Sequence, residues 1–75
     1  MQTPIHSEIA GIVLEIKLAP GSAVAIDEVV LMVECMKMYI PIASPVAGRI
    51  HSVAVAEGAL IEEGQLAFVV ESSAS

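Results

Sequence analysis

The chain has 75 residues, with three lysine or arginine side chains, nine aspartate or glutamate side chains and a formal net charge of −6. This length allows one small domain, and a hydrophobic content of 56% excludes disorder through low hydrophobicity. The acidic balance argues against nucleic acids and anionic membrane surfaces as partners. We expect one domain over residues 1–75, with 72–75 as a flexible tail.

An internal repeat organises the chain. A shift of 37 positions aligns residues 4–34 with residues 41–71 without an insertion in either half. The identical pairs include Pro4/Pro41, Ser7/Ser44, Gly11/Gly48, Gly21/Gly58 and Glu34/Glu71. Valine, isoleucine and leucine are enriched between glycine and proline breaks, so each half is predicted to consist of short strands.

In chain order, the second strand of each half begins at Gly11 or Gly48, where glycine suggests close backbone approach or a positive φ. The apolar pairs that follow are spaced by three and then by two. This spacing predicts a β-bulge or a sharp twist near Leu14–Glu15 and again near His51–Ser52. Turns are predicted next, at Gly21 and Gly58.

The last strand of each half alternates apolar positions. Val29, Leu31 and Val33 share one face, as do Leu66, Phe68 and Val70, and these larger sets are predicted to face the core. The longest apolar runs, such as Val29–Val33, are far shorter than the roughly 20 residues that span a bilayer. Two duplicated halves of short antiparallel strands should close on each other as a small flattened barrel or sandwich.

The segment between the halves is Cys35–Ile40, which has no counterpart in the repeat. A connection this short between two strands predicts a tight hairpin with Lys37 near its tip. The turn lacks the usual Asn-Gly or Asp-Gly, so a positive φ at Met36 or Lys37 would strain it by about 1–3 kcal/mol.

The run Glu34-Cys35-Met36-Lys37-Met38 resembles the biotin-acceptor motif of biotinyl domains, the carrier modules of biotin-dependent carboxylases such as acetyl-CoA carboxylase. The usual motif has Ala or Ser where Cys35 stands. The resemblance extends from about Ile5 to Glu71. It implies an all-β, flattened, antiparallel, eight-stranded barrel or sandwich of two quasi-twofold halves. The acceptor lysine lies on the hairpin that joins them, and the unbroken repeat leaves no room for a thumb insertion.

The same resemblance implies a function. Lys37 would carry covalent biotin, with Glu34, Cys35, Met36 and Met38 as its modification motif, and Gly11, Gly21, Gly48 and Gly58 as structural glycines. The implied partners are a biotin protein ligase, a biotin carboxylase and a carboxyltransferase. The carrier itself would be non-catalytic and would shuttle an activated carboxyl group. The motif does not distinguish acetyl-CoA, propionyl-CoA, pyruvate or urea as the carboxyl acceptor.

Two alternatives remain open. A lipoyl domain resembles the same fold, although its usual flank is Asp-Lys-Ala rather than Met36 and Met38. A cofactor-free interaction barrel would leave Lys37 unmodified. An enzyme acting alone is disfavoured because no acid–base or nucleophile–base set appears. His6 and His51 are not equivalent and form no ligand cluster, so no metal is expected. The single cysteine, Cys35, predicts a reducing compartment, the cytoplasm.

Overall fold

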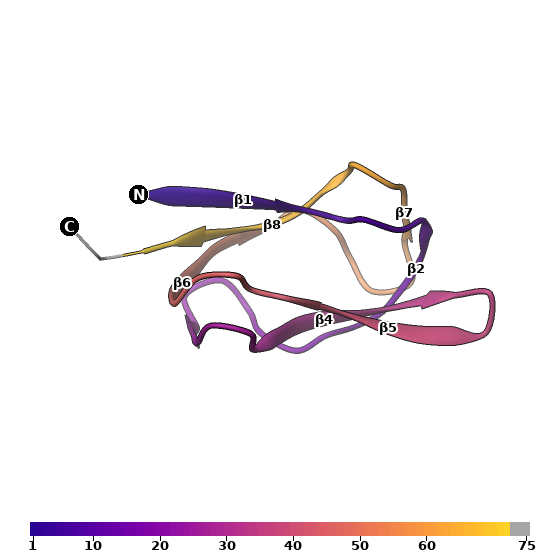
Figure 1. Cartoon of the computed structure of the whole chain (residues 1–75), viewed down its shortest axis with the longest axis horizontal. Coiled ribbons are helices and arrows are strands. Elements are labelled where there is room, and N and C mark those ends of the chain that lie inside the picture. The colour runs from indigo at the N-terminus through magenta and orange to yellow at the C-terminus, as the bar shows by residue number, and fades with distance from the viewer. Residues whose placement is uncertain (73–75) are drawn as a thin grey trace.

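The computed structural model describes residues 1–72 and consists of strands arranged in two four-stranded antiparallel sheets (Figure 1). The strands are β1 (Gln2–His6), β2 (Gly11–Ile16), β3 (Ala23–Val24), β4 (Val29–Cys35), β5 (Met38–Ala43), β6 (Gly48–Val53), β7 (Leu60–Ile61) and β8 (Leu66–Glu71). The described residues contain no helix long and apolar enough to cross a membrane. The predicted all-β fold is confirmed as a sandwich, because β1-β8-β6-β3 and β5-β4-β2-β7 form separate sheets.

The two halves are related by a pseudo-twofold axis. The shift of 37 positions converts β1–β4 into β5–β8, and it also converts the order of one sheet into that of the other. Backbone hydrogen bonds repeat in the same way: Gly21 N donates to Ile50 O over 2.8 Å, and Gly58 N donates to Val13 O over 2.7 Å. Each sheet therefore contains strands from both halves, and neither half forms a sheet by itself.

The bulges are where the sequence predicts them. The pairing of β2 with β4 shifts register between Val13 and Glu15, and the pairing of β6 with β8 shifts between Ile50 and Ser52. An extra residue in one strand increases its local twist, which helps two small sheets wrap around one core. The spacing of apolar residues by three thus corresponds to a real irregularity in the ladder.

The core lies between the sheets. Its buried apolar side chains are Ile5, Val13, Val24, Val30, Leu31, Val33, Ile50, Ile61, Ala67, Phe68 and Val70. The prediction that Val29 and Leu66 are core residues is wrong: both are half-buried, and their neighbours Val30 and Ala67 are fully buried. The reason is a register shift at the start of each strand, which breaks the simple alternation. In β4 it lies between Val29 and Leu31, and in β8 it lies between Leu66 and Phe68, which pair with His6 and Ile5.

Two serines are buried at equivalent positions, in loops that follow β1 and β5. Ser7 Oγ donates to Ile9 O over 2.6 Å, and Ser44 Oγ donates to Val46 O over 2.5 Å. Each hydroxyl also accepts from the backbone N–H of the same residue, Ile9 or Val46. These hydrogen bonds replace the ones that the loop backbone would otherwise form with water.

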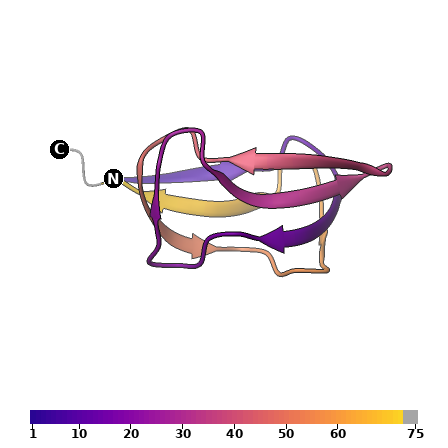
Figure 2. The same cartoon turned by 90° about the horizontal axis from the view of Figure 1, so that it is seen from below.

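The molecule is elongated, with extents of 40 × 19 × 18 Å. The β4–β5 hairpin projects at one end of the long axis, and the start of β1 and the end of β8 lie at the other (Figures 1 and 2). At the terminal end, Ser72 N donates to Met1 O over 2.8 Å. The rest of the predicted tail, residues 73–75, lies outside the described residues.

Candidate functional site

The hairpin between the two halves ends in a two-residue turn. Cys35 and Met38 form the last pair of the β4–β5 ladder, which leaves only Met36 and Lys37 to reverse the chain. Both residues have a positive φ, 52° at Met36 and 65° at Lys37. Two consecutive left-handed residues are the signature of a type I′ turn, whose twist matches that of the flanking strands. The tight hairpin predicted for this segment is therefore present.

This turn is strained by its own residues. Type I′ turns prefer Asn-Gly, and a left-handed conformation costs a non-glycine residue about 1–2 kcal/mol. The register pairs between β4 and β5, from Val29–Ala43 to Cys35–Met38, offset that cost. The chain thus places a lysine where folding alone favours glycine.

Lys37 and its neighbours extend into solvent. Met36 is 90% exposed and Met38 is 64% exposed, so neither methionine is a core residue. Lys37 is exposed, and none of the hydrogen bonds or ion pairs found among residues 1–72 involves its amine. Lys17 differs, because its Nζ lies 3.4 Å from Glu15 Oε1. The hairpin therefore presents a free primary amine between two exposed thioethers.

The rest of the predicted motif forms the base of the hairpin. Glu34 pairs with Tyr39 and is half-buried, while the free thiol of Cys35 is half-buried opposite Met38. A Cβ on Gly11 would lie 2.3 Å from the Glu34 carbonyl oxygen, so β2 approaches β4 closely at this point. Gly48 is packed in the same way against Glu71. Close approach, not a positive φ, explains this pair of glycines.

The other two predicted glycines serve as turn residues. Gly21 has a φ of 91° and Gly58 a φ of 85°, both in the left-handed region that favours glycine. The sequence reasoning missed a second such pair, Asp27 with a φ of 67° and Gly64 with a φ of 85°. These two residues occupy equivalent positions in the repeat, and the signal that was available is Gly64 itself.

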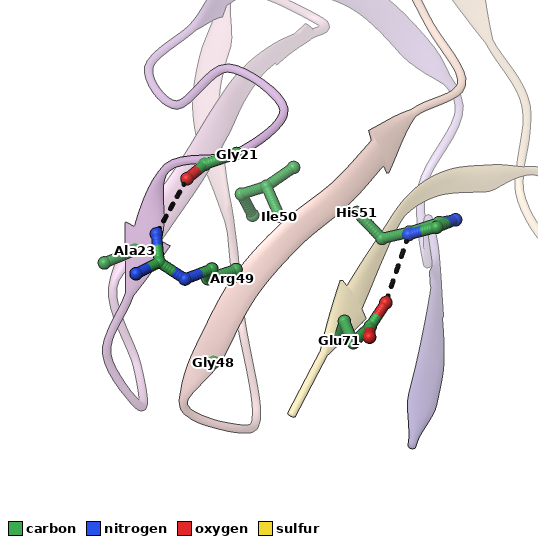
Figure 3. A pocket seen from close by; sticks show the side chains of 7 residues that line it. All are labelled: Gly21, Ala23, Gly48, Arg49, Ile50, His51 and Glu71. Atoms are coloured by element: carbon green, nitrogen blue, oxygen red, sulfur yellow. Dashed lines mark hydrogen bonds and ion pairs between the residues drawn. The ribbon is translucent and has the colours of Figure 1, made fainter. Parts of the chain in front are cut away.

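The remaining polar residues do not gather around Lys37. Residues 1–72 contain no group of three or more His, Cys, Asp or Glu side chains that could hold a metal ion. A hollow of about 570 Å³ lies near the terminal end, beside the first residue of β6 and the last of β8 (Figure 3). There Arg49 Nη1 donates to Gly21 O over 3.1 Å, and His51 Nδ1 lies 3.3 Å from Glu71 Oε2. This hollow is remote from the hairpin tip.

Comparison with known proteins identifies the family. Residues 1–70 match the model of the biotin/lipoyl family, which is described as biotin-requiring enzyme. The chain belongs to the biotin/lipoyl family. The biotinylated protein TB7.3 homologue of Mycobacterium leprae is 34% identical to it over 70 residues, which are 93% of this chain and 99% of that protein. The cofactor predicted from the sequence, covalently bound biotin, is confirmed at the level of the family.

Solved structures share the fold. The urea carboxylase of Kluyveromyces lactis matches with a TM-score of 0.89 and 22% identity, over 95% of this chain and 6% of the carboxylase. A single-chain, multi-domain long-chain acyl-CoA carboxylase matches with a TM-score of 0.86 and 27% identity, over 96% of this chain and 7% of that enzyme. The lipoyl domain of the Azotobacter vinelandii 2-oxoglutarate dehydrogenase complex matches with a TM-score of 0.76 and 23% identity, over 93% and 98%. The biotin/lipoyl domain thus spans only a small part of either carboxylase.

Proposed function

We propose that this domain is a biotin carboxyl carrier that is biotinylated on Lys37. In this role it moves an activated carboxyl group between a biotin carboxylase and a carboxyltransferase. The observation that carries the proposal is the exposed Lys37 amine, held in a two-residue turn between Met36 and Met38 at the junction of the two halves. Family membership supports biotin as the group attached.

The residues around the tip fit a tethered cofactor. The β4–β5 turn, which contains Lys37, lies at one end of a body 40 Å long, so a group on the lysine amine extends away from the sandwich. The paired strands β4 and β5 fix the base of the arm, while the lysine side chain beyond the turn has rotational freedom. A short flexible tether raises the effective concentration of its cargo at a partner's active site. Bound biotin would supply a ureido nitrogen that holds a transferable carboxyl group.

Attachment of biotin requires a ligase that positions Lys37 and also handles the proton that its amine loses. The amide bond forms between Nζ and the carboxyl carbon of adenylated biotin, and AMP and a proton are released. The proton released from Nζ needs an acceptor. No carboxylate or imidazole among residues 1–72 forms an ion pair with this amine, and we assign the role of proton acceptor to the ligase. Met36 and Met38 would offer it adaptable apolar contacts.

The carboxyl acceptor and the partner enzymes belong to the same proposal. The two similar carboxylases act on urea and on long-chain acyl-CoA, which supports carboxylation as the reaction served. The free thiol of Cys35 supports a reducing compartment such as the cytoplasm. The domain would be a module of the carboxylase, with the catalytic groups on its partners.

Mass spectrometry of the purified domain tests the proposal. Incubation with a biotin protein ligase, biotin and ATP should add one biotin, and peptide mapping should place it on Lys37. Lys37→Arg should prevent the addition, and the matched change Lys17→Arg should leave it intact. Absence of the adduct, or biotin on Lys17, would overturn the proposal. A lipoyl adduct formed in preference by a lipoate ligase would favour the lipoyl alternative, whose fold is also shared.

A further inference from the structure

The sheet that bears the hairpin has an apolar outer row. Cross-strand partners place their side chains on the same face of a sheet. Leu60 pairs with Ile12, Ile12 with Glu34, and Glu34 with Tyr39, so these four residues form one row across β7, β2, β4 and β5. Leu14, two residues after Ile12 on β2, extends the same side at the bulge. We call these five residues the apolar row.

The other sheet has an equivalent row of different chemistry. Ala23 pairs with Arg49, Arg49 with Glu71, and Glu71 with Gln2, and His51 stands at the equivalent bulge. We call these five residues the mirror row, and Figure 3 shows four of them. Each residue matches a member of the apolar row through the shift of 37 positions. The backbone is therefore the same on both sheets, and the difference lies in the side chains alone.

The fold does not use the apolar row for its own core. Leu60 is 73% exposed, Tyr39 is 66% exposed, and Ile12 and Leu14 are about 40% exposed. The inner side of the same strands is already packed with fully buried Val13 and Val33. The mirror row shows that this backbone tolerates arginine and histidine in place of Ile12 and Leu14. Contiguous exposed apolar side chains of this kind mark interaction sites.

The charge within the apolar row lacks the partner found on the other sheet. Glu71 in the mirror row has His51 Nδ1 at 3.3 Å. The residue equivalent to His51 is Leu14, so Glu34 loses that partner, and among residues 1–72 its carboxylate takes part in no hydrogen bond or ion pair. A half-buried carboxylate framed by apolar side chains complements a basic residue surrounded by an apolar patch.

We propose that the apolar row is the docking surface for the biotin protein ligase, which meets it with an apolar patch and a basic residue opposite Glu34. This inference rests on the proposed function of Lys37. Lys17 is also exposed, so an enzyme that acylates Lys37 and spares Lys17 must recognise the residues around the Lys37 amine. The apolar row begins at Tyr39, two residues after Lys37. The mirror row instead crosses the start of β1, the end of β8 and the start of β6, at the opposite end of the molecule from the β4–β5 turn.

The matched experiment exchanges the chemistry of the two rows. The double variant Ile12→Arg with Leu14→His takes the residues of the mirror row, and Arg49→Ile with His51→Leu is its control. Biotinylation is followed by intact mass with purified ligase, biotin and ATP, and folding by circular dichroism. We expect the first variant to lose about tenfold or more in kcat/KM, mainly through KM, and the control to stay within about twofold.

The outcomes separate this inference from the proposed function. If the wild-type chain is not biotinylated on Lys37, the proposed function fails. If the wild type is biotinylated and the folded apolar-row variant reacts at the same rate, the docking surface fails. If that variant does not fold, Leu60→Ala replaces it, because Ala23 stands at the mirror position; an unchanged KM for this variant would overturn the inference. Dimerisation through the row with unaltered biotinylation would assign it to a second copy and also overturn it.

Discussion

Gly11 lies directly against the backbone of Glu34, at the base of the acceptor hairpin. A Cβ at Gly11 would sit 2.3 Å from the Glu34 carbonyl oxygen and 2.7 Å from Val33 Cγ1. Gly48 has the same relationship with Glu71, whose carbonyl oxygen is also 2.3 Å from the Cβ position. The repeat therefore supplies two equivalent close contacts. Only the contact between Gly11 and Glu34 lies near Lys37, which follows Glu34 by three residues.

Gly11→Ala and Gly48→Ala should each lower the free energy of unfolding by about 1–3 kcal/mol, because backbone atoms must move to admit the methyl group. Urea titration measures this loss. At a temperature where both variants are folded, only Gly11→Ala should slow biotinylation, since it displaces Glu34 beside the hairpin. Equal rates for the two variants would contradict a local effect at the acceptor site.

Lys37→Gly should stabilise the fold while abolishing biotinylation. Glycine adopts the φ of 65° without the cost of about 1–2 kcal/mol that other residues pay in the left-handed region. We expect the free energy of unfolding to exceed that of Lys37→Ala by about 1 kcal/mol. Chemical denaturation of both variants tests this, and equal stability would show that the turn is not strained.

Gly64→Ala should destabilise the protein by about 1 kcal/mol, because its φ is 85° while the space around a Cβ is open. Gly64→Asp should cost less. The equivalent residue Asp27 already adopts a φ of 67°, and aspartate tolerates this conformation better than alanine. The midpoints of urea denaturation rank the two variants, and the reverse order would refute this reading of the pair.

Ser44→Ala should lower the free energy of unfolding by about 1–3 kcal/mol, since it leaves the backbone N–H and C=O of Val46 without their hydroxyl partner. Ser52→Ala serves as the control, because this half-buried serine forms no side-chain hydrogen bond among the described residues. It should change stability by less than about 0.5 kcal/mol. Thermal melts followed by circular dichroism compare the two, and similar losses would count against a special role for Ser44.

The repeat made much of this fold predictable. Matched glycines and apolar pairs indicated the halves, the two bulges and the hairpin with Lys37, because backbone geometry recurs wherever the pattern does. The burial of Val30 and Ala67 was not predictable, since a register shift depends on pairing with another strand. The bond from Ile16 N to Glu57 Oε2 was hidden for the same reason, because these residues are far apart in the sequence.

The candidate site was predictable from the sequence only in part. The motif indicated Lys37 and its neighbours directly, because they are consecutive in the chain. The apolar row was missed because its members come from four strands and only the sheet brings them together. A search for identical pairs also overlooks positions such as Ile12/Arg49 and Leu14/His51, where the halves differ. In a duplicated fold, these differences show where one half has acquired a task of its own.

The hydrogen bonds between Met1 and Ser72 hold the start of β1 and the end of β8 together, opposite the turn that carries Lys37. A polypeptide that continues from Met1 or from Ser72 would therefore start on the side remote from the amine. It would leave the approach of a modifying enzyme unobstructed. The same geometry makes the sandwich suitable for insertion into a surface loop of a host protein. The turn with Lys37 would then be the part of the domain farthest from the host.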